Sequence, residues 1–269
     1  MFDKLKWSKL YLFFVFVLLY TPIFYLILFS FNEGGTMNNF TGFTLEHYST
    51  VLQDNRLLQI VVQTLLLALL SSLISTIIGT LGAICIYYVR SYRMKDFLLN
   101  ANNILLVSPD VIIGSSFLLL FTIVGFQLGF VSVLLAHIAF SIPIVVLMVL
   151  PSLEEINPSM LKAAEDLGAN WVQMLWHVIL PNIFPGILSG FFMAFTYSLD
   201  DFAVTFFVTG NGFTTLAVEI YSRARRGVSL EINALSALLF IASLLLVLGY
   251  YYISIYSKRV KKVKKVVAE

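Results

Sequence analysis

The stretch VIIGSSFLLLFTIVGFQLGFVSVLLAHIAFSIPIVVLMVLPSL, residues 111–153, contains 43 consecutive residues without Asp, Glu, Lys or Arg. A helix that spans the roughly 30 Å hydrocarbon core of a bilayer needs about 20 apolar residues, because each residue advances about 1.5 Å. The stretch is therefore too long for one span and long enough for two. It predicts two adjacent membrane helices, near 101–124 and 130–151.

Similar runs without charged residues continue on both sides of this stretch, at 10–32, 57–89, 167–199 and 232–257. The whole chain is 59% hydrophobic and 12% charged, whereas soluble domains are about 45–50% apolar and about 25% charged. The sequence predicts an all-α membrane protein with six transmembrane helices in a single domain, residues 1–269. The remaining spans are expected near 10–31, 62–86, 182–201 and 234–256.

The distribution of basic residues predicts the orientation. With six spans both termini lie on one side, and that side carries 13 of the 17 Lys and Arg residues, against 4 on the other. Basic residues are enriched in cytoplasmic loops, so both termini are expected in the cytoplasm. The C-terminal basic cluster, residues 258–265, is expected to lie against anionic membrane lipid.

The polar stretch 154–181, EEINPSMLKAAEDLGANWVQMLWHVILP, falls on the cytoplasmic side in this topology. Asn157 and Pro158 form a strong helix start, and Gly168 is a typical helix stop. Asn170 can cap a second short helix, and Pro181 is expected to begin the next span. The pattern predicts two short helices joined by a glycine bend. It suits either an amphipathic connector at the membrane surface or an element that docks a partner protein.

The spacing within this stretch resembles a known motif. Ala163-Ala164 is followed after three residues by Gly168, after nine more by Val178, and after one more by Leu180-Pro181. This is similar to the EAA motif in the permease subunits of ABC importers. The acidic residue that names the motif is Lys162 here, and Glu165 follows the two alanines. This resembles a charge swap across one helical turn, so the salt-bridge partner on an ATPase is expected to differ.

Further blocks resemble the polyamine branch of the same family; they lie at 108–110, 127–130, 163–169, 198–201, 207–210 and 232–235. The resemblance implies a type I, MetI-like permease fold in the cytoplasmic membrane that moves spermidine or putrescine. It also implies a heterodimer with a second permease chain, two ATPase subunits that bind ATP and Mg, and an extracytoplasmic solute-binding protein. The residues it assigns to ATPase coupling are Ala163, Ala164, Glu165, Leu167, Gly168, Leu180 and Pro181.

No catalytic, metal or cofactor site is expected in the chain itself. The sequence contains no G-x-x-x-x-G-K-[S/T], H-E-x-x-H or G-x-S-x-G motif. Nucleotide is therefore expected on a separate subunit, and nothing in the chain suggests nucleic-acid binding. His137, inside the fourth span, favours a hydrogen-bonded core histidine over a ligand or proton relay.

Carboxylates in or near spans are costly and mark candidate solute paths. Asp110 lies in the third expected span, and Asp200 and Asp201 lie at the outer end of the fifth. Adjacent helical residues point about 100° apart, so only one of that pair is expected to face the path. Tyr197 and Ser198, one turn below Asp201, are expected to share its face.

Other functions remain open from sequence alone. An importer of the same class could carry another solute, although Asp110, Asp200 and Asp201 argue against an anion. A secondary transporter could use the same carboxylates as proton or sodium sites. A membrane enzyme is disfavoured, because the sequence offers no combination of nucleophile and base.

Overall fold

The computed structural model describes residues 2–226, 229–241 and 244–245. These residues are helical apart from turns, loops and one isolated bridge between Asn32 and Phe43. The chain forms two compact units: Met1–Leu58 with Ile220–Glu269, and Gln59–Glu219.

The first unit contains the long apolar helix α1 (Phe2–Phe29) and the short helix α2 (Glu46–Gln53). The loop between them is organised by buried Asn32, whose amide donates to the carbonyls of Thr36 and Asn39 while its oxygen accepts from Thr41 N. The first expected span, 10–31, agrees with α1. Most of the sixth expected span, 234–256, lies outside the described residues. The described part of this region contains the apolar helix Leu230–Ile241.

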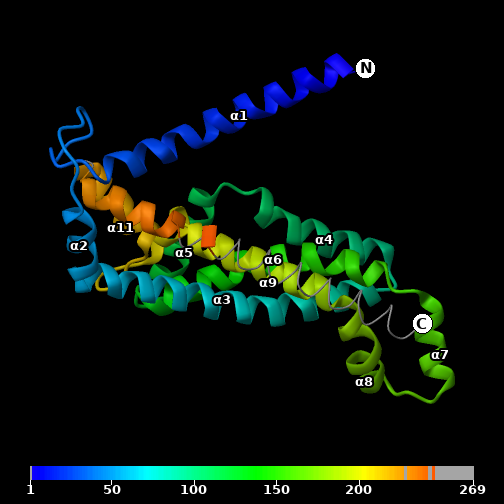
Figure 1. Ribbon diagram of the computed structural model, residues 1–269. Helices are drawn as coiled ribbons and strands as arrows, with labels where there is room; N and C mark the ends of the chain where they lie inside the picture. The colour runs from blue at the N-terminus through cyan, green and yellow to red at the C-terminus, as the bar shows by residue number, and fades with distance from the viewer. Residues whose placement is uncertain (1, 227–228, 242–243, 246–269) are drawn as a thin grey trace. The chain divides into compact units, whose positions relative to one another are not determined.

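In the second unit, α3 (Asn55–Tyr88), α6 (Phe130–Glu154) and α9 (Leu180–Asp200) run alongside one another (Figure 1). Helices α4 (Tyr92–Val107), α5 (Asp110–Val124) and α10 (Ala203–Val208) complete this bundle, and α11 (Leu216–Arg226) begins in it. At one end of the bundle lie α7 (Pro158–Asp166) and α8 (Trp171–Met174). Within the described residues, four helices are long and apolar enough to cross a membrane, or five if α4 and α5 count as one span.

Glycines bring α3 and α9 close to the backbone of α6. A Cβ atom at Gly79 of α3 would lie 2.6 Å from Val145 Cβ, and one at Gly190 of α9 would lie 3.3 Å from Val145 Cα. One turn earlier on α9, a Cβ at Gly186 would lie 3.1 Å from the Met148 carbonyl oxygen. Gly186 and Gly190 form a G-x-x-x-G pair, the spacing that lets membrane helices approach closely. Small residues therefore set the separation of the three central helices.

The third expected span, 101–124, is wrong as a single helix. It begins nine residues earlier, at Tyr92, and breaks at Ser108-Pro109, where α4 and α5 meet at 102°. Pro109 has no N–H to continue a helix, and the residue before a proline avoids the helical region; Ser108 has the extended angles φ −69° and ψ 137°. Asp110 therefore starts a new helix, after a first helix of 16 residues that is about 24 Å long by helical rise.

The fifth span also differs from expectation. Instead of a separate short helix followed by a span near 182–201, one continuous helix runs over Trp171–Asp200. Pro181 lies within it and does not begin it. A proline in a helix clashes with the carbonyl four residues before it, here that of His177, and this carbonyl belongs to the widened π-helical turn Leu175–Ile179. The wide turn lets the helix continue through Pro181.

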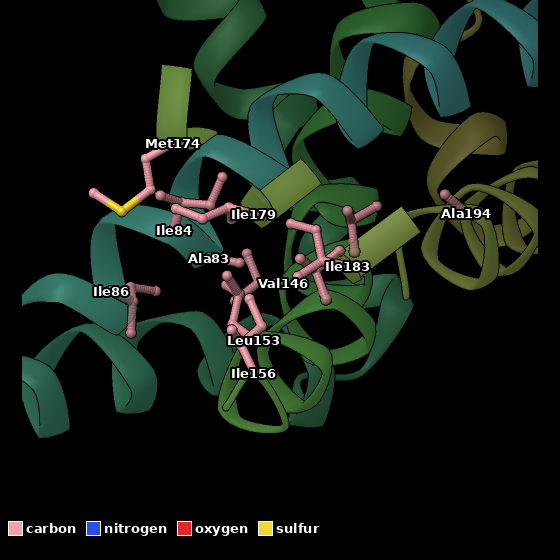
Figure 2. Close-up of a cluster of buried hydrophobic side chains, with 12 residues drawn as sticks. Ala83, Ile84, Ile86, Val146, Leu153, Ile156, Met174, Ile179, Ile183 and Ala194 are labelled. Atoms are coloured by element: carbon pink, nitrogen blue, oxygen red, sulfur yellow. The ribbon is translucent and has the colours of Figure 1, made fainter. Parts of the chain in front are cut away.

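A buried apolar cluster anchors the 154–181 segment to the bundle (Figure 2). Met174 of α8 and Ile179 of the π-helical turn pack with Leu153 and Ile156 and with Ala83 of α3. Leu161 of α7 packs against the same cluster. The segment therefore follows the movements of the bundle and is not a loose loop.

The glycine contacts predict different effects for two neighbouring alanine substitutions in α3. Gly79→Ala forces a methyl group against Val145 and should destabilise the protein by about 1–3 kcal/mol, the usual cost of overpacking. Gly82→Ala is the matched control, because its Cβ would lie 3.7 Å from Val146 Cγ2, an ordinary contact. The measurement is the unfolding temperature of the purified chain in detergent. Equal midpoints for the two variants would contradict the proposed role of Gly79.

Candidate functional site

Asp110 and the end of α9 meet in space although 87 residues separate Asp110 from Tyr197 in sequence. The Tyr197 hydroxyl donates a hydrogen bond of 2.9 Å to Asp110 Oδ1. The Tyr197 ring is held by Phe140 of α6, edge to face at a centroid distance of 5.0 Å. Because Asp110 is the first residue of α5, its carboxylate also lies at the positive end of that helix. The break at Pro109 thus places the charge where the dipole of α5 stabilises it.

Asp200 and Asp201 have different surroundings. Asp200 is exposed at the last position of α9, whereas the Asp201 side chain is only 5% exposed. The Asp201 carboxylate accepts from the backbone N–H groups of Val204 (3.2 Å) and Thr205 (2.8 Å) and from the Thr205 hydroxyl (2.7 Å). Asp201 therefore caps the first turn of α10.

The expectation that Asp201 shares a helix face with Tyr197 and Ser198 is wrong. The chain leaves helical geometry at Asp201, where φ is −65° and ψ is 120°. Ser198 points away from the carboxylates and is buried, with hydrogen bonds to Ser71 and His137.

Four of the five expected path residues line one cavity of about 230 Å³: Asp110, Tyr197, Asp200 and Asp201, together with Phe202 and Ala203. Ser198 is not among the lining residues. Near this cavity α10 approaches α5 closely, because a Cβ at Gly114 of α5 would lie 3.0 Å from Val204 Cα. The cavity combines carboxylates with aromatic rings, which are the groups that attract ammonium ions.

Polar side chains lie behind this cavity, and the sequence did not predict the contacts between them. His137 is fully buried, and its two ring nitrogens lie 2.7 Å from Ser198 Oγ and 2.8 Å from Thr205 Oγ1. The sequence favoured a hydrogen-bonded core histidine, and the structure agrees. Its only sequence signal was a polar residue within an apolar run, and nothing in the sequence identified its partners.

The 154–181 segment has the local structure that its sequence predicts as far as Asn170. The Asn157 side chain accepts from Ser159 N at the start of α7. Gly168 adopts φ +77°, with hydrogen bonds from Gly168 N to Glu165 O and from Ala169 N to Ala164 O. This is the Schellman arrangement, which requires the left-handed conformation that glycine adopts without strain. Asn170 and Gln173 then form a reciprocal capping box.

The expected coupling residues do not all lie on one surface. Leu167 is 88% exposed, and Ala163, Glu165 and Gly168 are exposed beside it. A shallow groove is lined by Ala164, Leu167, Gly168, Ala169, Gln173, His177 and Val178. Leu180 instead packs against the buried cluster, and Pro181 lies outside the groove lining.

In the first unit, Asp54 begins α3 and binds Arg223. The Leu57 N–H, the Arg223 guanidinium at 3.2 Å and the Arg56 N–H together hold the pKa of the Asp54 carboxyl below its usual value. Arg223 also lies 3.7 Å from Glu231. Arg223 is one of the four basic residues on the side expected to lie outside, and these contacts give it a structural role.

The sequence of this chain matches the model of a known protein family. Residues 75–262 match the family model of the binding-protein-dependent transport system inner membrane component, and the chain belongs to that family of ABC-importer permeases. Members of this family are transport components of the inner membrane and not enzymes.

Among the curated relatives of this chain are two permeases whose names give the transported solute. The chain is 38% identical over 235 residues to the spermidine/putrescine transport system permease protein PotC of Escherichia coli K12, covering 87% of this chain and 89% of the relative. It is 34% identical over 242 residues to the putrescine transport system permease protein PotI of the same strain, covering 87% and 85%.

Solved structures share the fold. A bacterial ABC transporter involved in the import of the acidic polysaccharide alginate matches with a TM-score of 0.73 at 18% identity, covering 94% of this chain and 95% of the other. The MetNI methionine ABC transporter matches with a TM-score of 0.60 at 18% identity, covering 74% and 95%.

The unequal surroundings of the two neighbouring aspartates predict unequal effects on stability. Asp201→Ala removes the cap of α10 and should destabilise the protein by about 1 kcal/mol. Asp200→Ala should change stability by less than about 0.5 kcal/mol, as is usual for an exposed side chain. Thermal unfolding of the two variants in the same detergent tests this. A larger loss for Asp200→Ala would contradict the assignment of Asp201 as the cap.

Proposed function

We propose that this chain is a permease subunit of an ATP-driven importer that carries polyamines, spermidine or putrescine, across the cytoplasmic membrane. The observation that carries this proposal is the cavity in which Asp110, Asp200 and Asp201 gather with Tyr197 and Phe202. Carboxylates and aromatic faces are the groups that bind ammonium ions. The names of the relatives PotC and PotI support the same solute class.

Within the cavity, Asp110 and Asp200 are the carboxylates assigned to the solute. Asp201 contributes negative charge from the wall, because both its oxygens already accept hydrogen bonds from α10. Ser198 supports the wall from behind through its bond to His137. The cavity is smaller than the roughly 300–1,000 Å³ of typical ligand pockets, which suits a slender solute or one amine group of a longer one.

The transporter assembly follows from the class of protein. The chain pairs with a second permease of the PotB type, an extracytoplasmic binding protein delivers the solute, and two ATPase subunits bind ATP and Mg. Leu167 and its exposed neighbours Ala163, Glu165 and Gly168 enter a groove of the ATPase, with α7 as the coupling helix. The anchoring of this segment by Met174 and Ile179 supports its use as a mechanical link.

The chain forms one permease domain with six spans and both termini in the cytoplasm. The 13-to-4 distribution of basic residues supports this orientation. A reporter that is active only in the cytoplasm, fused after Glu269, should therefore be active. Activity of an export-dependent reporter at the same position would overturn the orientation.

The left-handed conformation of Gly168 predicts a specific coupling defect. Gly168→Val strains the bend by about 1–2 kcal/mol. It causes no steric clash at the Cβ, because an added Cβ would have no neighbouring atom within 4 Å. The variant should reach the membrane and lose stimulation of the ATPase. Gly125→Val is the matched control, since Gly125 has φ +71° and equally open surroundings at the end of α5.

ATPase activity of the reconstituted complex, with and without loaded binding protein, distinguishes the two variants. Equal stimulation in both variants would show that the 154–181 segment is not the coupling element.

Charge removal from the cavity tests the solute. A hydrogen bond to a charged group contributes about 1.5–3 kcal/mol. Asp110→Asn and Asp200→Asn keep side-chain shape and remove charge, so uptake of labelled putrescine at low concentration should fall about tenfold or more. Insertion should not suffer, because a neutral amide is cheaper in a bilayer than a carboxylate. Asp96→Asn, at the far end of α4, is the control and should transport normally.

Normal uptake by both cavity variants, with intact ATPase docking, would refute a cation path through these residues. Uptake that persists without ATP but follows a proton or sodium gradient would favour the secondary transporter instead.

A further inference from the structure

His137 forms a buried junction between three helices. It lies on α6 and is 0% exposed, and its Nδ1 and Nε2 atoms reach Ser198 of α9 and Thr205 of α10. Both partners are themselves buried, at 1% and 0% exposure. Both ring nitrogens of this buried histidine are therefore hydrogen-bonded, and the bonds connect α6 to two other helices.

The hydrogen bonds continue in both directions from this junction. On one side, the Ser71 hydroxyl of α3 donates to Ser198 Oγ at 3.0 Å. On the other, the Thr205 hydroxyl donates to Asp201 Oδ2 at 2.7 Å, and His137 Nε2 lies 3.4 Å from the same oxygen. Since Thr205 donates to Asp201, its oxygen is free to accept from His137 Nε2–H, and Nδ1 then accepts from Ser198. From Ser198 onward, the donors in this arrangement point toward the carboxylate, whereas Ser71 Oγ also lies 3.1 Å from the Ala68 carbonyl oxygen.

Three buried hydroxyls of α3 form a more local bond. Thr64, Ser72 and Ser75 donate to backbone carbonyls three or four residues earlier in the same helix. This local bond is the usual way for a helical hydroxyl to be satisfied. Thr205 instead donates to Asp201 and contacts His137. Its pairing therefore serves the carboxylate.

We propose that His137 is a positioning residue of the solute path: through Thr205 it holds Asp201, and with it the neighbouring Asp200, in the cavity wall. Asp200 directly precedes Asp201, so any loosening of Asp201 displaces the exposed carboxylate assigned to the solute. The inference rests on the proposed function and adds to it residues that do not touch the solute. A chain of bonds that polarise one another in a site of low dielectric is stronger than its members alone.

Thr205 offers a matched pair of variants. Thr205→Val keeps the shape and removes the hydroxyl, whereas Thr205→Ser keeps the hydroxyl. In proteoliposomes that contain the assembled transporter, Thr205→Val should raise the KM for labelled putrescine about tenfold, and Thr205→Ser should stay within about twofold. An unchanged KM in Thr205→Val, with only a lower unfolding temperature, would show a purely structural role and overturn the inference.

His137 offers a second pair, read out in the same assay. Gln can place an amide N–H where Nε2–H lies, whereas Asn is too short to reach Thr205, so His137→Gln should retain a lower KM than His137→Asn. His137→Asn should add little to the KM of Asp201→Asn, because both changes break the same chain. Fully additive effects would overturn the inference. Absence of ATP-dependent putrescine uptake by the wild-type complex would instead overturn the proposed function.

Discussion

The close approach of α3 and α9 to the backbone of α6 at Val145 is the constraint on which the rest of the second unit depends. Gly79 and Gly190 lie against the same residue from two sides, so any larger side chain there separates the three helices. In a bilayer, where no hydrophobic effect drives helices together, such contacts carry much of the association. From Val145, α6 reaches His137 two turns earlier and Leu153 two turns later, which ties the cavity and the 154–181 segment to one helix.

Local signals in the sequence predicted helix caps and turns correctly. They did not predict how long helices break, continue or pack against one another. Asn157, Gly168 and Asn170 act on their immediate neighbours, and each adopts the predicted cap or turn. The effects of Pro109 and Pro181 were harder to predict, because the effect of a proline depends on how the surrounding helical turns adjust. Pro109 breaks an expected span, whereas Pro181 is absorbed by the π-helical turn before it. Hydropathy alone cannot separate these outcomes, since apolar runs flank both prolines in the sequence.

The candidate site shows the same division. The sequence indicated Asp110, Asp200 and Asp201 because a carboxylate in or near a membrane span is energetically costly. The structure brings all three to one cavity. Their separate roles depend on where α9 ends. A helical wheel placed Asp201 with Tyr197 and Ser198, but the helix stops one residue earlier, and the carboxylate turns to cap α10. Both aspartates line the cavity, whereas helical geometry predicted that only one of the pair would face the path.

The continuous helix over Trp171–Asp200 joins the two functional regions directly. Its first turns carry the groove beside Leu167 and Gly168, and its last turn carries Tyr197, which binds Asp110. The two regions therefore share one helix, which contains the π-helical turn and Pro185 between them. Its irregular turn, Leu175–Ile179, lies near the groove, and the buried Ile179 is held by the apolar cluster. π-Helical turns are frequent at functional sites, and this one lies between the groove proposed to meet a partner and the rest of the span.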